Sequence, residues 1–313
     1  MGLLFNRVER KKLIEMVRLE PFRRKIVSFY RYAPIEDPQA LRDELYKSWL
    51  ELKVLGRIYV AREGMNAQMS IPEMNWEKFL ETLSAYPFFK DIFINHASTE
   101  SSYAFFKLDV RAREKIVVHR LQEDPFHNST PGKHLSPKEF HEMANDENAI
   151  VVDARNSYEC DIGHFENAFL PTSKTFSKIL PELKEKLAPY KDKKIMMYCT
   201  GGIRCEIASA YLNKEGFQEI YQLQGGIIHY INEMQNSSTP SKYKGSVYVF
   251  DERMAEATNR EKMGKCYQCD AAHSAHSNCG YIRCHGLIIQ CPSCAEKYQN
   301  CCSVECIEKR NLL

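Results

Sequence analysis

A cysteine at the end of an apolar segment is the strongest candidate for chemistry in this chain of 313 residues. Residues 194–198 (KIMMY) read as a buried strand, and Cys199 follows them directly. The tight loop after it consists of Thr200, Gly201, Gly202, Ile203 and Arg204. A helix is predicted from Cys205 to Leu212. The loop N–H groups, the helix N-terminus and the arginine charge all favour an anion, which lowers the pKa of a thiol and yields a nucleophilic thiolate.

Cys199 has a simpler interpretation as a buried structural cysteine at a sheet edge. Two adjacent glycines and an arginine close behind it favour the reactive interpretation. Cys205 could resolve a persulfide on Cys199 by forming a disulfide. We expect it instead to be a small buried residue at the start of the helix, because neighbouring loop and helix positions need not direct two sulfurs together. Cys160 is expected to be structural.

The end of the chain is rich in cysteine. Nine of the 12 cysteines lie after residue 260, a density that indicates metal binding rather than disulfides in a reducing compartment. Two Cys-x-x-Cys pairs stand among further cysteines, and together they can supply eight thiolates to two tetrahedral zinc ions. The candidate ligands are Cys266, Cys269, Cys279, Cys284, Cys291, Cys294, Cys302 and Cys306, with His273, His276 and His285 as candidate substitutes. The alternatives are a disulfide cluster and a reduced tail without metal, and spacing does not show which cysteines share an ion.

Composition bounds the class of protein. A hydrophobic content of 44% suffices for the cores of two or three domains, and a formal net charge of +2 excludes a polycation. No run approaches the ~18 apolar residues of a membrane span, so no membrane partner is predicted. Residues 1–20 are interrupted by charged side chains, unlike a secretory signal. We therefore expect a cytoplasmic protein, and its oligomeric state stays open.

The first part of the chain predicts the order β-α-β-β-α-β. An amphipathic helix over 5–19 precedes it. Strands are predicted over 25–32, 55–61, 67–71, 91–97 and 102–110, with a turn at 62–66 and helices over 38–53 and 73–85. Asp37 and Pro38 are a candidate cap and first-turn proline of the first of these helices. This order is that of a ferredoxin-like α+β fold, in which helices cover one face of a sheet.

Strands and helices alternate from Ser136 onward. This alternation predicts an α/β domain whose parallel sheet is covered by helices on both faces. Cys199 then lies at the carboxyl end of a strand, where ligands of open α/β sheets bind. Ser246 to Phe250 is a candidate edge strand after a polar linker. The expected fold class is therefore α/β multidomain, with an N-terminal ferredoxin-like domain, a central parallel α/β domain and a cysteine-rich tail.

Basic residues flank the outer strands of the first domain. They are Arg23, Arg24, Lys25, Arg111, Arg113 and Lys115. If they share one face, they could neutralise the phosphates of an RNA partner. The simpler interpretation is that these charges form a solvated face.

The Cys199 loop resembles the active loop of rhodanese-type sulfurtransferases, in which six residues starting at the cysteine curl around a persulfide. Dual-specificity phosphatases carry one more residue, so the position of Arg204 favours sulfur over phosphate chemistry. Asp153-Ala154-Arg155 and Gly163-His164-Phe165 match the opening of rhodanese domains. The resemblance implies that Asp153, Arg155 and His164 are scaffold beneath the loop. The predicted divisions are an N-terminal extension (1–22), a ferredoxin-like, acylphosphatase-like domain (23–122), a linker (123–135), a rhodanese-like domain (136–236), a linker with an edge strand (237–263) and a zinc-binding tail (264–313).

Several longer motifs resemble the bacterial tRNA uridine-34 hydroxylase family. They are VSFYRY, GRIYVAREGMNAQMS, VVDARNSYECDIGHFENA, MYCTGGIRCEIASAYL, CPSC and CSVEC. The resemblance implies a tRNA partner, conversion of its wobble uridine to 5-hydroxyuridine with molecular oxygen as cosubstrate, and Cys199 as the essential cysteine, acting as a persulfide. No flavin or nicotinamide fingerprint stands out. The alternatives are a sulfurtransferase that moves sulfane sulfur to a thiol acceptor and a binding protein with an inactive rhodanese fold.

Overall fold

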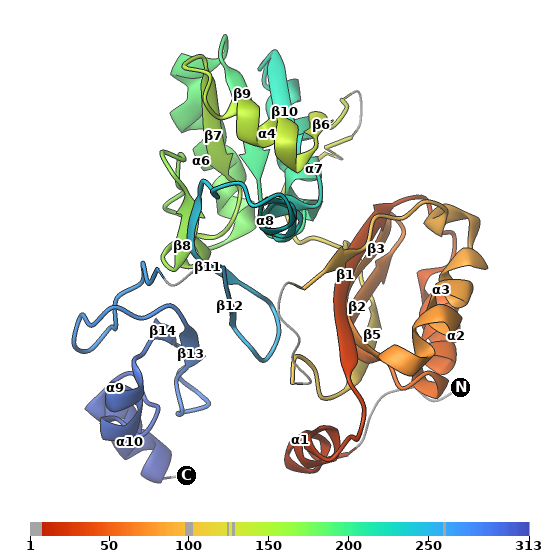
Figure 1. The fold of residues 1–313 in the computed structure, drawn as a ribbon, viewed down its shortest axis with the longest axis vertical. Helices are drawn as coiled ribbons and strands as arrows, with labels where there is room; N and C mark the ends of the chain where they lie inside the picture. The colour runs from red at the N-terminus through yellow and green to blue at the C-terminus, as the bar shows by residue number, and fades with distance from the viewer. Residues whose placement is uncertain (1–7, 98–102, 124, 127–128, 259–260, 313) are drawn as a thin grey trace.

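The computed structural model describes residues 8–97, 103–123, 125–126, 129–258 and 261–312, which form three parts (Figure 1). The first is a five-stranded sheet with helices, the second a four-stranded sheet with helices, and the third the cysteine-rich tail. No helix of these described ranges is long and apolar enough to cross a membrane.

The first domain has the predicted β-α-β-β-α-β order. Its elements are α1 (Arg10–Arg18), β1 (Arg24–Tyr32), α2 (Pro38–Glu51), β2 (Leu55–Ala61), β3 (Gly64–Pro72), α3 (Trp76–Ser84), β4 (Asn95–His96) and β5 (Leu108–Ala112). The strand order is β4-β1-β3-β2-β5, and only β5 joins its neighbour in parallel. The first four strands therefore confirm the ferredoxin-like fold, and β5 extends its edge.

The predicted boundaries were least accurate at the last two strands. The strand predicted over 91–97 is only Asn95–His96, and the one predicted over 102–110 is β5, with residue 102 outside the described residues. The helix predicted over 73–85 begins as a 3₁₀ turn (Glu73–Asn75) before α3. Asp37 caps α2 as predicted, because its side chain accepts hydrogen bonds from two backbone N–H groups of the first turn.

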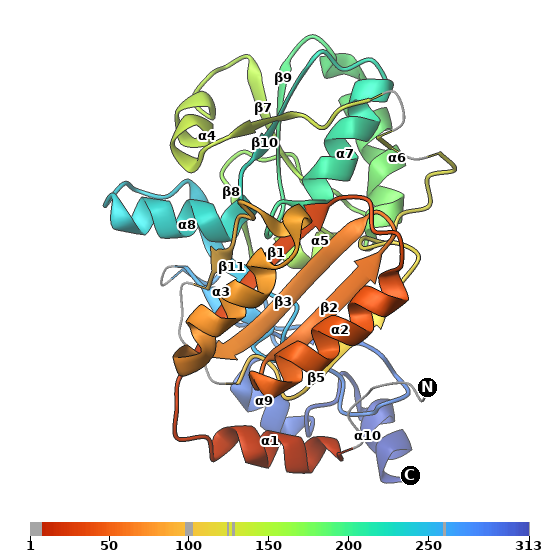
Figure 2. The same ribbon diagram turned by 90° about the vertical axis from the view of Figure 1, so that its right-hand side faces the viewer.

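One face of the first sheet carries the helices and the other does not. α2 and α3 pack on the covered face around Trp49, Phe79 and Met69. The open face is turned toward the second domain (Figures 1 and 2). Since side chains alternate along a strand, β1 buries Phe29 among the helices and directs Tyr30 into the space between the domains.

The second domain is the predicted parallel α/β domain. Its elements are β6 (Lys133–Leu135), α4 (Pro137–Met143), β7 (Ala149–Asp153), α5 (Ser157–Cys160), β8 (Gly163–Phe165), α6 (Phe176–Leu187), β9 (Lys194–Tyr198), α7 (Ile203–Lys214), β10 (Glu219–Leu223) and α8 (Gly226–Asn236). β6, β10, β9 and β7 form the sheet in that order, all in parallel. α6 and α7 pack on one face, and α4 and α8 on the other.

The segment after α8 returns to the second domain. β11 (Tyr243–Tyr248) pairs with β8 and with β12 (Ala255–Ala257), and Tyr243 and Val247 lie in the core of the domain. The edge strand predicted at 246–250 thus begins three residues earlier. The tail contains β13 (His276–Asn278), β14 (Leu287–Ile289), α9 (Pro292–Lys297) and α10 (Val304–Asn311).

Candidate active site

Cys199 lies at the carboxyl end of β9, in a loop whose backbone is bent around its sulfur. The Gly202 N–H donates to Cys199 Sγ at 3.1 Å. Gly202 has a φ of +102°, which glycine adopts readily. The first turn of α8 supports the loop from behind, because the N–H groups of Ile227 and Ile228 donate to the carbonyls of Cys199 and Thr200. The fold therefore fixes the cysteine at the predicted strand end.

The pKa of Cys199 is lowered to about 6. Burial alone would raise this pKa, but a hydrogen bond from the Cys205 thiol, the charge of Arg204 and the N–H groups of Arg204 and Gly202 outweigh it. The pKa of Cys205 is raised, first by burial and then by its contact with Cys199, so Cys205 is the protonated donor. Cys205 is fully buried in the first turn of α7, as expected, and from there its thiol influences the pKa of Cys199.

Arg204 is held in a buried ion pair. Its guanidinium donates to the two carboxylate oxygens of Glu159 at 2.5 and 2.9 Å and to Thr200 Oγ1 at 3.1 Å. Glu159 is fully buried in α5. Much of the charge predicted to act on Cys199 is therefore shared with a carboxylate that sequence reasoning did not select. The only signal for Glu159 was its place just after the Asp153-x-Arg155 motif.

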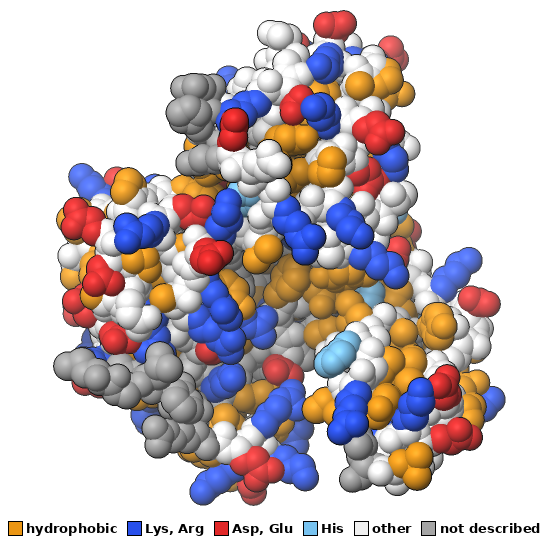
Figure 3. Space-filling view, turned by 180° about the vertical axis from the view of Figure 1, so that it is seen from behind, with side chains coloured by type: hydrophobic (Ala, Val, Ile, Leu, Met, Phe, Trp, Pro, Cys, Tyr) orange, Lys and Arg blue, Asp and Glu red, His pale blue; other side chains and the backbone are white. Residues whose placement is uncertain are grey.

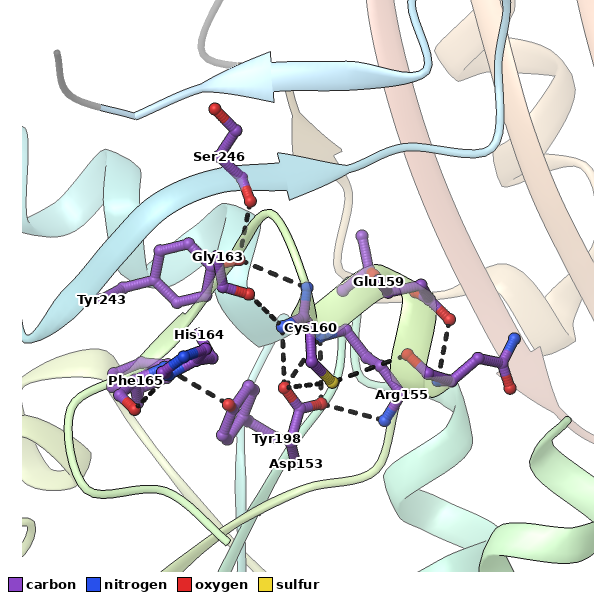
Figure 4. Close-up of polar contacts among 12 residues, drawn as sticks. Asp153, Arg155, Glu159, Cys160, Gly163, His164, Phe165, Tyr198, Tyr243 and Ser246 are labelled. Carbon is purple, nitrogen blue, oxygen red and sulfur yellow. Dashed lines mark hydrogen bonds and ion pairs between the residues drawn. The ribbon is translucent and has the colours of Figure 1, made fainter. Parts of the chain in front are cut away.

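Asp153 and Arg155 form a second buried pair beneath the loop (Figure 4). Arg155 donates to Asp153 at 2.7 Å and also to the Gly163 carbonyl and the Tyr243 hydroxyl. The hydroxyl of Tyr198, the residue before Cys199, helps to lower the pKa of Asp153 and accepts the Phe165 N–H at 3.3 Å. The Asp153–Arg155 pair thus supports β9, the strand that leads to Cys199.

His164 lies on the edge strand β8, whereas Cys160 is buried beside Asp153. The His164 ring contacts the Phe165 carbonyl at 3.0 Å, on the β8 edge, and does not line the space beside Cys199. Cys160 is buried and its thiol donates to Asp153 at 3.3 Å. Its pKa is raised, chiefly by burial. It is therefore a protonated structural residue.

A cavity of about 1230 Å³ lies between the open face of the first sheet and the Cys199 loop. Figure 3 shows hydrophobic side chains in the hollow and lysine and arginine side chains around it. Its aromatic lining includes Tyr30, Tyr32, Tyr59, Phe93, Phe105, Phe126, Tyr158 and Phe250, and its cations are Arg31, Arg57, Arg120, Lys174, Lys178, Arg204 and Arg253. Flat rings and cations in one cavity suit a single-stranded nucleotide, whose base stacks and whose phosphate is anionic.

Glu206 accepts hydrogen bonds from three sides at the wall of this cavity. Its donors are Tyr30 at 2.8 Å, His134 at 2.9 Å and Gln222 at 3.0 Å. Burial by itself would raise the pKa of Glu206, but the hydrogen bonds from these partners lower it by more. The pKa is therefore below its usual value, and the carboxylate stays ionised. The hydrogen bond to Glu206 raises the pKa of His134. Sequence reasoning missed this network, whose members lie far apart in the chain.

The basic residues predicted to face RNA do not form the cationic lining of the cavity. Arg24 is buried and bonds to Glu20 at 2.6 Å and to two backbone carbonyls. Arg111 is paired with Asp109 at 2.6 Å. Neither lines the cavity. Burial therefore removes Arg24 from any basic surface, whereas Arg111 is exposed and its contact with RNA stays a prediction.

The eight predicted metal ligands gather into two groups of four. Cys266, Cys269, Cys291 and Cys294 form one, and Cys279, Cys284, Cys302 and Cys306 form the other, with all four sulfurs of a group within 4.8 Å of one another. In each group the third cysteine donates its N–H to the sulfur of the first, at 3.4 Å. Along the chain, the first and third pairs of cysteines therefore belong to one group and the second and fourth pairs to the other. The spacing of the cysteines alone did not show this pairing. Neither group includes Cys301 or a histidine.

Known proteins match this chain along most of its length. Three family models cover residues 24–116 ("UPF0176 acylphosphatase like domain"), 136–233 ("Rhodanese-like domain") and 244–307 ("Rhodanase C-terminal"). The tRNA uridine(34) hydroxylase of Leptospira interrogans is 50% identical over 95% of this chain and 80% of its own length. That of Pectobacterium carotovorum is 42% identical over 100% of this chain and 88% of its own. A crystal structure of a rhodanese-related protein from Thermoplasma volcanium covers 32% of this chain and 92% of its own, at 26% identity and a TM-score of 0.27.

Proposed function

The chain belongs to the tRNA uridine(34) hydroxylase family, and from that premise we propose that uridine 34 of tRNA is hydroxylated beside Cys199. The observation that carries the proposal is the low pKa of this thiol at the wall of a cavity of about 1230 Å³. A thiolate is therefore available at neutral pH next to a space large enough for a nucleotide. tRNA is cytoplasmic, and we place the enzyme there.

The shape of the site favours RNA over a small sulfur donor. A sulfurtransferase acting on thiosulfate needs room for a few atoms, whereas this cavity extends from the loop across the open face of the first sheet. Tyr59 on β2 and Phe126 offer faces for stacking bases, and Lys174 and Lys178 offer charges for phosphates. The first domain, over residues 23–122, thus supplies the substrate platform and the rhodanese-like domain, over 136–236, supplies the reactive loop.

The reaction replaces the C5–H of uracil with C5–OH, and we propose molecular oxygen as the source of the added atom. The second oxygen atom leaves as water, with two electrons and two protons supplied by two thiols that become a disulfide. Cys199 acts as a thiolate or as a persulfide, and Gly202 and Cys205 donate hydrogen bonds that hold its charge. Arg204 remains in place because Glu159 binds both arms of its guanidinium. Asp153 and Arg155 position the strand beneath them.

The two cysteine groups bind zinc as structural ions in this proposal. Each offers four sulfurs at a spacing that fits tetrahedral coordination, and backbone N–H groups already point at the first sulfur of each. Apart from the sulfurs, the tail has little core of its own, so metal binding would supply most of its folding free energy.

The test is 5-hydroxyuridine in tRNA from cells that lack the endogenous enzyme and express each variant. Wild type should restore the nucleoside, as measured by mass spectrometry, and Cys199→Ser should not, because serine cannot form a persulfide or a thiolate. Cys160→Ser is the matched control, a buried cysteine of the same domain. Normal levels with Cys199→Ser would remove Cys199 from the chemistry.

A further inference from the structure

Asn95 of β4 carries an unsatisfied acceptor in the wall of the cavity. The residue is only 5% exposed, and it lines the cavity together with Cys199 and Gly201. Its Nδ2 donates to the Gly225 carbonyl at 2.9 Å. Because a carbonyl can only accept, this bond fixes which end of the amide is nitrogen. The oxygen, Oδ1, has no hydrogen-bond donor among the described residues.

A buried acceptor without a donor is unusual and destabilising in a folded protein. The folded protein keeps the cost of removing this oxygen from water without gaining a hydrogen bond in return. Asn95 could relieve the cost by turning its amide, but the bond to Gly225 joins the two domains and opposes that rotation. A ligand that brings an N–H group into the cavity would satisfy Oδ1 and leave the domain contact intact.

Gly201 of the Cys199 loop lies beside the Asn95 side chain. A Cβ at this position would lie 3.7 Å from Asn95 Nδ2 and 3.9 Å from Ser28 Oγ, which are ordinary contact distances. Its φ is outside the left-handed region, so neither a clash nor the backbone conformation requires glycine here. The bare backbone instead leaves room beside the loop for a flat ligand to approach the Asn95 side chain.

We propose that Asn95 is a specificity-determining residue whose Oδ1 accepts the N3–H of the substrate uracil. This inference rests on the proposed function. Uracil in RNA has a single ring N–H donor, at N3, flanked by two carbonyl acceptors. Cytosine has an unprotonated N3, so its lone pair would oppose Oδ1. An acceptor without its own donor therefore selects uracil over cytosine at the Cys199 loop.

The experiment measures binding, so it does not depend on hydroxylation. Fluorescence anisotropy gives the affinity of wild-type protein for anticodon stem-loop RNAs that differ only at position 34. The RNAs carry uridine, cytidine or N3-methyluridine, and the last keeps both carbonyls but lacks the donor. We expect uridine to bind about ten-fold more tightly than either of the others. Equal affinity for all three would overturn the assignment of Asn95, whereas no measurable binding of any would contradict the proposed function itself.

Two variants of Asn95 separate base recognition from domain docking. Asn95→Leu should bind the three RNAs equally, because the acceptor is gone. Asn95→Asp keeps an acceptor and should keep the preference for uridine over N3-methyluridine, although it loses the donor to Gly225. Asn232→Leu is the matched control: Asn232 Nδ2 donates to the His96 carbonyl at 2.8 Å, a second amide contact between the domains that lies outside the cavity.

The control should discriminate like wild type. If Asn232→Leu loses the preference as completely as Asn95→Leu does, Asn95 acts only by docking the domains and the proposal is wrong. Gly201→Ala is an independent test of how the base approaches Asn95, because the alanine Cβ fits into the free protein without a clash. It should leave the melting temperature unchanged and weaken binding of the uridine RNA, and unchanged binding would exclude the approach past Gly201.

Discussion

Tyr30 of β1 donates a hydrogen bond of 2.8 Å to Glu206 of α7, so the first domain is bonded to the helix that begins in the Cys199 loop. The same hydroxyl would lie 3.0 Å from a Cβ at Gly202. Tyr30 therefore touches the loop as well as the helix. The geometry of the reactive cysteine depends on how the first domain docks against the second.

Tyr30→Phe should loosen this contact while keeping the ring. Glu206 keeps two donors, so we expect a loss of only about 1 kcal/mol in the free energy of unfolding. The 5-hydroxyuridine content of tRNA should fall about ten-fold, because the loop loses its contact with the docked domain. Tyr86→Phe is the control, since it removes a tyrosine–glutamate bond of 3.2 Å within the first domain. Equal activity of the two variants would show that the contact of Tyr30 is incidental.

Opposite changes in the Arg204–Glu159 pair should move the pKa of Cys199 in opposite directions. Arg204→Gln removes a positive charge and should raise it above about 6, whereas Glu159→Gln leaves Arg204 uncompensated and should lower it further. The fraction of thiolate falls as the pH drops through the pKa, so the ultraviolet titration of each variant, minus that of the same variant with Cys199→Ser, measures the shift.

Both changes should also destabilise the protein by about 3–5 kcal/mol, since each leaves a buried charge without its partner. Urea denaturation measures this loss. If the two variants shift the pKa in the same direction, the charge of Arg204 is not what acts on Cys199.

The hydrogen bond from Cys205 predicts a difference between two substitutions. Cys205→Ser keeps a donor and should keep the low pKa of Cys199 and most activity, whereas Cys205→Ala should raise that pKa and reduce activity. Titration and tRNA nucleoside analysis report the two effects. Should Cys205→Ser be as inactive as Cys205→Ala while its pKa stays low, Cys205 reacts as a thiol and resolves an intermediate on Cys199.

Zinc content should divide between the two cysteine groups. We expect two equivalents in wild type and one in either Cys294→Ser or Cys306→Ser, because each change removes one ligand of a different group. Cys301→Ser should keep both, since Cys301 is buried outside either group. Atomic absorption after purification under reducing conditions gives the content. Protein without zinc in the wild type would contradict the proposed ions.

The salt dependence of tRNA binding should identify the cations that contact phosphate. Lys174, Lys178 and Arg120 line the cavity and have no salt bridge within the described part of the chain. Each alanine substitution among them should flatten the slope of log affinity against log salt by about 0.7 if it removes one contact with single-stranded RNA. Arg111→Ala is the control, because Arg111 is paired with Asp109. A slope that changes only in this control would place the RNA elsewhere.

The sequence by itself determined the features that depend on neighbouring residues. A strand, a glycine loop and a helix in succession place Cys199 at the carboxyl end of β9 whatever surrounds it. Asp37 caps α2 for the same reason, since cap and helix are adjacent. The eight metal-ligand candidates were also readable, because a segment with so many cysteines and so little apolar surface has few other ways to fold.

Tertiary structure decided which distant groups meet at the site. Tyr30 and Glu206 are 176 residues apart, and Glu159 reaches Arg204 from 45 residues away. Such contacts depend on how two separately folded domains dock and on the strand register within each, which local patterns do not encode. The unsatisfied oxygen of Asn95 is likewise a feature that only the tertiary structure decides. Burial, the bond to Gly225 and the cavity beside it arise only when β4 and the Cys199 loop are brought together.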